Sequence, residues 1–362
     1  MAFLLKQLKI VRYENALRKN NSMKRFLKFL YEEIFLFFLQ KLGLMKYYYW
    51  YIIRLVVNKR YKKLIEQDYT QNVQGEHSRR VVFICDGKKM HGGLTDRIRG
   101  IVSTYLVCKE LNIEFKILFI HPFDIRNYLV PNEVDWQIDE KDLIFDRSKT
   151  KVCFIDSFDE SNFERKKQRK YMITIFNKSY QEFHVYTNAS FSYDFNFSKA
   201  FNELFKPSKI VYEDLLIHKQ KLGPKYIDIT LRFQNLFGDF FERDYLPISP
   251  KEQSILLDRC IKQIKCIHND YQDLKILVTS DSRTFLDEIK KMDFIYTIDG
   301  KLVHMDCNND NSIELHKKSF VDFFMIANSD KIFLLKTGKM YNSGFPYSAS
   351  RIYNKSFTLI EF

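Results

Sequence analysis

The chain has 362 residues, enough for two domains of ordinary size. It is 46% hydrophobic and 16% aromatic, a composition that supports packed cores and excludes an intrinsically disordered chain. The formal net charge of +13 is local, because residues 1–80 contain 17 Lys and Arg against 6 Asp and Glu, whereas residues 81–362 contain 41 against 39. This distribution argues against nucleic-acid binding by the whole chain, and no nucleic-acid partner is predicted.

Residues 1–79 are predicted to form a basic amphipathic helical extension. The most apolar part, residues 34–57, is interrupted by Lys41, Lys46 and Arg54, so every window of about 20 residues contains charge and a membrane span is the least favoured interpretation. Two interpretations stay open: a pair of helices lying in the interface of an anionic membrane, or an extension packed on the rest of the chain. The first places the protein peripherally at the inner face of the cytoplasmic membrane.

The six cysteines show neither a CxxC pair nor the spacing of a zinc site. Cys85 and Cys153 lie within apolar runs, where cysteine behaves as a small hydrophobic residue. We therefore expect a reducing compartment, no disulfide framework and no bound metal.

Residues 80–222 have the pattern of an α/β domain. Short β-branched and aromatic runs predict strands, and apolar residues recur at helical spacing from Ile98 to Leu106. Strand, helix and strand in this order indicate a parallel sheet. The strands are expected within residues 79–87, 114–120, 151–156, 171–176 and 183–188, and the helix at residues 94–112.

Residues 223–362 have a second α/β pattern, which starts at the Gly223-Pro224 break. Ser249 is placed to cap a helix whose first residue is Pro250. Two Rossmann-like domains facing a cleft are the simplest architecture. Strands are expected at residues 226–233, 274–281 and 331–338, helices at 249–271, 282–292 and 312–330, and a loop feeding a short helix at 340–362.

The sequence HGGLTDRIRG, residues 91–100, joins the first strand to the first helix. Glycines at a strand-to-helix turn expose backbone N–H groups at a helix N-terminus, which suits a phosphate group. The alternative is a tight turn in which Thr95 or Asp96 caps the helix. Asp96 and Arg97 either contact a ligand, or Asp96 caps the helix and orients Arg97, and Arg99 is expected to be solvated.

Arg232 follows a predicted strand, where a guanidinium group is able to bind phosphate oxygens with two hydrogen bonds. Its alternative role is a salt bridge with Asp228 or another nearby acid. Asp239 and Glu242 lie on the aromatic loop that follows, and either is a candidate general base for an acceptor hydroxyl. The alternative for each is a solvated loop carboxylate.

Two further turns have residues suited to a nucleotide. Asp281 and Ser282 follow a strand and open a helix, where they cap it or hold a ribose hydroxyl or a base edge. Ser343, Gly344 and Phe345 precede another short helix, whose N-terminus suits a phosphate group. The alternative for this second turn is an ordinary surface loop.

The order of these four motifs over residues 80–362 resembles the fucosyltransferase superfamily. HGGLTDRIRG is similar to the Gly-Gly-Leu-Gly-Asn/Asp loop of that family, and ITLRF to its His-x-Arg motif. VTSDS is similar to the Thr-Asp-Ser/Asp motif, and YNSGFPYSAS to the Ser-x-Phe-Ser-x-x-Ala motif. Three positions depart from the pattern: Thr95 replaces a glycine, Thr230 the histidine and Pro346 a serine.

The resemblance implies a GT-B-like fold and an inverting transfer of fucose from GDP-fucose to a sugar hydroxyl, without a metal or another cofactor. Arg232 would contact the donor pyrophosphate, and the remaining donor contacts implied are His91, Gly92, Gly93, Asp96, Arg97, Asp281, Ser282, Ser343, Gly344 and Phe345. His91 would contact the fucose or an acceptor hydroxyl. The predicted acceptor is a glycan or lipid-linked glycan of a cell-surface polysaccharide. Two alternatives are the same fold with another nucleotide sugar, and a non-catalytic membrane-associated scaffold.

Overall fold

The computed structural model describes residues 35, 41, 58–70, 78–155, 161–191, 196–240, 246–300 and 312–362. The chain divides into two compact units, Met1–Ile65 and Glu66–Phe362. Of the predicted extension before the first sheet, α4 (Asn58–Glu66) is described as a helix, but most of residues 1–57 lie outside the described residues. No described helix has the length and apolarity needed to cross a membrane.

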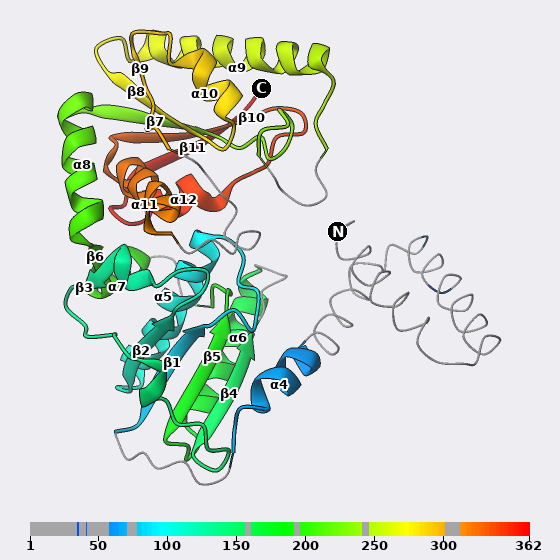
Figure 1. Cartoon of the computed structure of the whole chain (residues 1–362), viewed down its shortest axis with the longest axis vertical. Helices are drawn as coiled ribbons and strands as arrows, with labels where there is room; N and C mark the ends of the chain where they lie inside the picture. Colours follow the sequence, from blue (N-terminus) through cyan, green and yellow to red (C-terminus); the bar gives the residue numbers. More distant parts are fainter. Residues whose placement is uncertain are drawn as a thin grey trace. The chain divides into compact units, whose positions relative to one another are not determined.

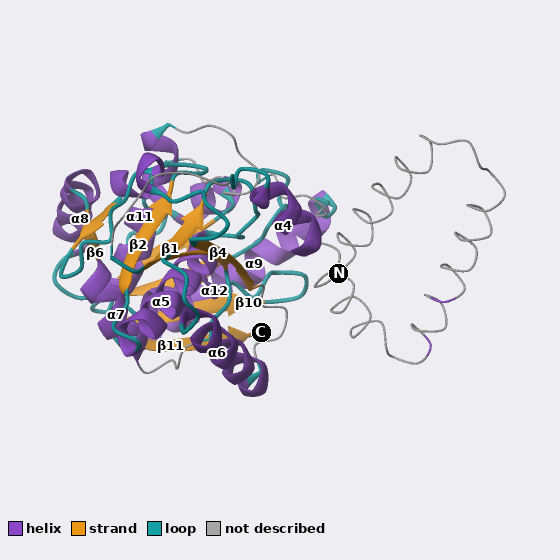
Figure 2. Ribbon diagram, turned by 90° about the horizontal axis from the view of Figure 1, so that it is seen from below, coloured by secondary structure: helices purple, strands orange, loops and turns teal. Residues whose placement is uncertain are grey.

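The first sheet is parallel and has the strand order β2-β1-β5-β4. Helix α5 connects β1 to β2 and buries Ile98, Ile101 and Tyr105, the face that the sequence spacing predicts. Figures 1 and 2 show α5 and α6 beside these strands, and the two helices contact each other. The elements are β1 (Arg80–Cys85), α5 (Leu94–Glu110), β2 (Glu114–Phe119), β4 (Thr150–Ile155), α6 (Asn162–Phe176) and β5 (Glu182–Thr187).

The prediction of a strand at residues 171–176 is wrong, because these residues end α6. Their β-branched side chains favour a strand locally, but the helix begins at a good cap, where the Ser161 side chain accepts a hydrogen bond from the Glu164 N–H. Met172, Ile175 and Phe176 are buried, and their spacing of three and then one is helical. Tertiary packing of this face therefore overrides the local β propensity.

The second sheet is also parallel, with the order β11-β10-β7-β8-β9. Ser249 caps α9 as predicted, in a reciprocal arrangement with Glu252. The last strand, β11, lies in the segment predicted as loop and short helix, and its largely exposed edge position explains its weak apolar pattern. The elements are β7 (Tyr226–Leu231), α9 (Pro250–Asp270), β8 (Lys275–Ser280), α10 (Arg283–Ile289), β9 (Ile295–Tyr296), α11 (Ile313–Asn328), β10 (Lys331–Lys336), α12 (Gly344–Ser350) and β11 (Ser356–Glu361).

One hydrophobic core extends from the first sheet through α11 to the second sheet. Phe83 and Phe183 of the first sheet belong to the same buried cluster as Phe320 of α11 and Ile332 of β10. The predicted boundary at residue 223 falls between the sheets but stays a prediction, since Glu66–Phe362 forms one compact unit. The connecting elements are η2 (Ile125–Asn127), β3 (Leu129–Pro131), η3 (Glu140–Asp142), α7 (Phe197–Leu204), β6 (Phe205–Pro207) and α8 (Lys209–Leu222).

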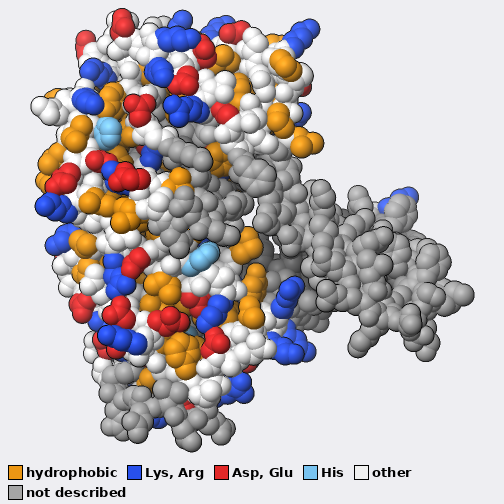
Figure 3. Space-filling view, viewed as in Figure 1, with side chains coloured by type: hydrophobic (Ala, Val, Ile, Leu, Met, Phe, Trp, Pro, Cys, Tyr) orange, Lys and Arg blue, Asp and Glu red, His pale blue; other side chains and the backbone are white. Residues whose placement is uncertain are grey.

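Acidic and basic side chains are interspersed over the face of the molecule seen in Figure 3. This mixture is what the near balance of 41 Lys and Arg against 39 Asp and Glu after residue 80 leads us to expect. Among the coloured residues of this view, neither sign of charge gathers in a large patch.

Candidate functional site

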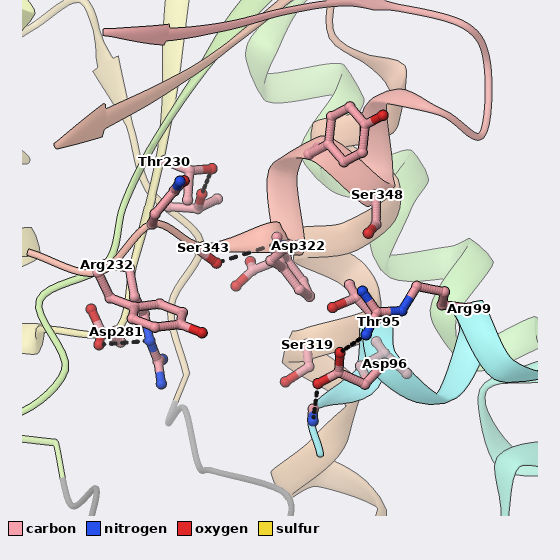
Figure 4. A pocket seen from close by; sticks show the side chains of 18 of the residues that line it. Thr95, Asp96, Arg99, Thr230, Arg232, Asp281, Ser319, Asp322, Ser343 and Ser348 are labelled. Atoms are coloured by element: carbon pink, nitrogen blue, oxygen red, sulfur yellow. Dashed lines mark hydrogen bonds and ion pairs between the residues drawn. The ribbon is translucent and has the colours of Figure 1, made fainter. Parts of the chain in front are cut away.

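A cavity of about 570 Å³ lies where the carboxyl ends of β7 and β8 approach the N-terminus of α5. This volume is in the range of small-molecule sites. In open parallel sheets, ligands bind beyond the carboxyl ends of the strands, so the position also suits a ligand. Figure 4 shows Thr230, Arg232 and Asp281 on one side, opposite Thr95, Asp96 and Arg99. Predicted site residues in the lining are Gly93, Asp96, Arg232, Asp281, Ser343, Gly344 and Phe345.

On the side of the first sheet, the cavity is bounded by the turn that precedes α5, which contains Gly92 and Gly93 and is called the glycine elbow below. Gly92 has φ +85°, and a Cβ there would lie 2.4 Å from the Asp96 Oδ2 atom, so glycine is required. The N-cap is Gly93 rather than Thr95 or Asp96. The Asp96 carboxylate accepts a hydrogen bond from the Gly93 N–H at 3.0 Å and one from Arg99 Nη2 at 2.8 Å. Asp96 thus completes the cap and orients Arg99.

Arg99 lines the cavity, contrary to the expectation of a solvated side chain. Its Nε atom donates to the Asn188 carbonyl oxygen at 3.1 Å, while its Nη2 atom bonds Asp96. The helical spacing of three residues brings Asp96 and Arg99 together on the face that meets the cavity. The guanidinium group is therefore held by two separate contacts.

His91, Gly92 and Arg97 are not part of the cavity lining. His91 is fully buried, with its Nδ1 atom 3.2 Å from the Thr187 carbonyl oxygen, and this burial lowers the pKa of the imidazole well below its usual range. Arg97 donates to the Gly92 carbonyl oxygen, and its guanidinium carbon lies 5.7 Å from the centre of the Phe119 ring. His91 and Arg97 therefore stabilise the glycine elbow by contacts outside the cavity lining.

Arg232 follows β7, and its guanidinium group is fixed in place at the cavity. Its Nε atom lies 3.3 Å from the Asp281 Oδ2 atom, and its guanidinium carbon lies 4.5 Å from the centre of the Phe240 ring. The acid beside it is thus Asp281, at the end of the neighbouring strand, rather than Asp228. The fixed group is well placed to meet an anion without losing further side-chain freedom.

Asp281 is itself held by the backbone. Its two carboxylate oxygens accept hydrogen bonds from the N–H groups of Phe233 at 2.8 Å and Gln234 at 2.6 Å. Burial raises the pKa of the Asp281 carboxyl to about 6, while Arg232 and the backbone N–H groups oppose this rise. At neutral pH the carboxyl is therefore largely ionised and able to orient Arg232.

Asp239 lies outside the cavity lining, at the N-terminus of α10. Its carboxylate accepts hydrogen bonds from Ser282 Oγ at 2.9 Å and from the Thr284 N–H at 2.7 Å. Ser282 is the N-cap, with its Oγ atom 3.2 Å from the Phe285 N atom, and it is fully buried. Asp239 and Ser282 therefore serve the start of this helix, and Glu242 lies outside the described residues.

The turn before α12 forms another part of the lining. The Ser343 side chain accepts a hydrogen bond from the Phe345 N–H at 3.2 Å and caps the helix. Phe345 contacts Phe323 of α11 with ring centres 5.3 Å apart, so the aromatic residue fixes the turn against the core. Pro346 occupies the first turn of α12, where its missing N–H has no helical acceptor.

Asp322 and Ser319 of α11 also line the cavity, and neither residue was predicted from the sequence. Both oxygens of Asp322 accept hydrogen bonds from Lys318 Nζ, at 2.8 and 2.7 Å, and both residues are buried. The sequence does contain an indication of this pair, because Lys318 and Asp322 are opposite charges four residues apart in a strongly apolar helix. Charged residues are rarely buried unless they are paired. Within the described residues, no group of three or more His, Cys, Asp and Glu is arranged to hold a metal ion.

No known protein-family profile and no curated protein matches the chain. Solved structures do match. A NodZ alpha-1,6-fucosyltransferase soaked with GDP-fucose is 12% identical, with 79% of this chain and 95% of that chain covered and a TM-score of 0.51. The fucosyltransferase NodZ from Bradyrhizobium is 10% identical, with the same coverage and TM-score. The chain therefore has the GT-B-like α/β fold of fucosyltransferases.

Proposed function

We propose that this chain is a glycosyltransferase that transfers fucose from GDP-fucose to a hydroxyl group of a glycan. The observation that carries the proposal is Arg232, whose guanidinium group is fixed by Asp281 and Phe240 at a cavity of suitable size. The fold shared with NodZ supports the same class of reaction. Sequence motifs that resemble those of fucosyltransferases surround this cavity.

The diphosphate of the donor would lie against Arg232, which offers several N–H donors to its oxygens. The backbone N–H groups near Gly93 and in the turn at residues 343–345 would add further donors. The Asp322 carboxylate would accept hydrogen bonds from the N1–H and amino groups of guanine, which an adenine does not present in the same arrangement. The cavity thus has chemical groups for both ends of GDP.

In the reaction, the bond between the fucose anomeric carbon and the β-phosphate oxygen breaks, and the acceptor oxygen attacks from the opposite face. Inversion at the anomeric carbon then gives an α-fucoside from the β-linked donor. The acceptor hydroxyl would give its proton to a general base, for which Glu242 stays the candidate from the sequence, and GDP leaves with the electron pair of the broken bond and its negative charge. Because Arg232 is positioned before the reaction, its charge stabilises the developing diphosphate with little reorganisation. We propose that this reaction needs no metal ion.

The test is a thermal-stability screen of the full chain with GDP-fucose, GDP-mannose, GDP and UDP-sugars, followed by product analysis with candidate glycans. We expect GDP and GDP-fucose to raise the melting temperature, since a ligand at 100 times its Kd stabilises the folded state by about 2.7 kcal/mol. A selective effect of UDP-sugars would indicate the same fold with another donor. Stabilisation by none of them would support a non-catalytic scaffold.

We also propose that the N-terminal part brings the enzyme to the cytoplasmic face of a membrane, where a lipid-linked glycan would be its acceptor. In α4 the side chains of Lys59, Arg60, Lys62 and Lys63 are exposed, and basic helices of this kind are attracted to anionic lipids. Co-sedimentation with phosphatidylglycerol vesicles is expected at low salt and is expected to weaken at high salt. Equal binding to phosphatidylcholine vesicles would contradict an electrostatic attachment.

Replacing Asp239 with alanine is expected to affect stability rather than chemistry. The variant loses the acceptor that Ser282 Oγ and the Thr284 N–H share, so the free energy of unfolding should fall by about 1 kcal/mol. Its kcat should stay within about threefold of the wild-type value, whereas loss of a general base lowers rates by about 10²–10⁴. Denaturant unfolding and fucose-transfer kinetics measure the two effects, and a loss of kcat in the larger range would restore Asp239 as the base.

A further inference from the structure

Behind the lining of the cavity lies the buried carboxyl group of Asp228, which is connected to the cavity by the hydroxyl groups of Thr230 and Thr279. Asp228 and Thr230 are two residues apart on β7 and so share one face of the sheet. Thr230 is paired in register with Thr279 of β8. Asp228 is fully buried, whereas Thr230 and Thr279 line the cavity.

These three side chains form a continuous hydrogen-bonded chain. The Thr230 Oγ1 atom is 2.9 Å from the Asp228 Oδ2 atom and 2.7 Å from the Thr279 Oγ1 atom. The Asp228 Oδ1 atom has no hydrogen-bond partner in the part of the chain that the structure describes. The Asp228 carboxyl group is therefore linked to the cavity through these two threonine hydroxyl groups.

The charges around Asp228 favour its neutral form. Asp322 of α11 is the nearby acid, and both of its oxygens are bonded to Lys318, which makes that cation unavailable to Asp228. His218 of α8 acts on Asp322, and Tyr226 on the same strand is the other titratable neighbour. Burial is the largest cause, and with the negative charge of Asp322 it raises the pKa of the Asp228 carboxyl well above its usual range, against the opposing effect of the Thr230 and Thr279 hydroxyl groups.

The protonation state of Asp228 decides the direction of the hydrogen bonds. If Asp228 is ionised, Thr230 donates to it, and Thr279 is then able to donate to Thr230, which leaves mainly acceptor lone pairs toward the cavity. If Asp228 is neutral, its proton lies on Oδ2, because Thr230 Oγ1 is the bonded partner and Oδ1 has none. Thr230 then accepts from Asp228 and donates to Thr279. The Thr279 hydroxyl then no longer donates to Thr230, and its hydrogen is available to an acceptor in the cavity.

We propose that Asp228 is a positioning residue for the donor nucleotide: through Thr230 it turns the Thr279 hydroxyl into a hydrogen-bond donor that faces the bound GDP. This inference rests on the proposed function, since it takes GDP as the occupant of the cavity. It also explains how a threonine serves at position 230, where the resembling family has a histidine. A hydroxyl whose direction is fixed by a buried acid replaces an imidazole as the polar group at this place.

The test is a set of GDP titrations by calorimetry on the full chain. Asp228→Ala releases the hydroxyl pair, and Thr279→Val removes the donor with little change of shape. Each is expected to weaken GDP binding about tenfold, the size of one hydrogen bond. Asp228→Asn, whose amide donates to Thr230 as the neutral acid does, and Thr279→Ser are expected to bind GDP within about threefold of the wild type.

The double variant Asp228→Ala/Thr279→Val separates positioning from a general loss of structure. If Asp228 acts through Thr279, the double variant binds GDP about as weakly as either single variant, whereas independent effects would multiply to about 100-fold. Independent effects, or an Asp228→Asn variant as weak as Asp228→Ala, would overturn the inference. Thermal melting of each variant checks its fold, and Thr279→Val alone still tests the donor if Asp228→Ala is unstable. Failure of the wild type to bind GDP would instead overturn the proposed function.

Discussion

Replacing Arg232 with alanine is expected to weaken GDP binding about 100-fold and to remove fucose transfer. Charge-assisted hydrogen bonds contribute about 1.5–3 kcal/mol each, and Arg232 is held in advance by Asp281 and Phe240. The fold should survive, because the pKa of Asp281 is already about 6 with the arginine present. Without that cation the pKa rises further, so Asp281 takes up a proton near neutral pH and no buried charge is left unpaired.

Calorimetric titration with GDP and transfer kinetics with GDP-fucose measure this effect. Arg232→Lys is the informative companion, since it keeps the charge but loses the planar group that bonds two oxygens, and an intermediate affinity is expected. Arg126→Ala is a matched control: it removes an arginine that is paired with Asp124 and Asp139 and does not line the cavity. GDP affinity within threefold of the wild type in Arg232→Ala would show that the diphosphate binds elsewhere.

The acidic partner of Arg232 could not be predicted from the sequence. Asp228 was the nearer acid along the chain, but it lies inside the sheet and bonds Thr230. Asp281 is about 50 residues away, and it meets Arg232 because β7 and β8 are neighbours with Leu231 opposite Ser280. Strand order and register decide this pairing, and local sequence contains neither. The arginine at a strand end was predictable from its motif, whereas its partner was not.

The elements whose pattern is strong were predicted well. Helices α5 and α9 have helical spacing and good N-termini, and both begin within a residue of the expected position. Residues 171–176 and the edge strand β11 were missed, because burial of one face decides the first and pairing with β10 decides the second. The same limit applies to His91 and Arg97, since periodicity alone does not say which side of a glycine elbow faces the cavity.

The carboxylate of Asp322 has two roles to separate by mutation: it pairs with Lys318 within the fold, and it is proposed to contact the guanine base. Asp322→Asn is expected to lower the free energy of unfolding by about 3–5 kcal/mol, since it leaves the buried Lys318 cation without its partner. Weak GDP binding by this variant would then reflect both instability and loss of the carboxylate. Denaturant unfolding together with GDP titration therefore cannot separate the two causes in a single substitution.

The double variant Lys318→Met/Asp322→Leu does separate them. It replaces a buried ion pair with apolar side chains of similar volume, an exchange that is often neutral or stabilising. We expect its free energy of unfolding to return to within about 2 kcal/mol of the wild type. Its preference for GDP over ADP should be lost, with the two affinities within about threefold, because no carboxylate remains to accept hydrogen bonds from the guanine N1–H and amino groups. A stable double variant that still prefers GDP would show that another group in the cavity reads the base.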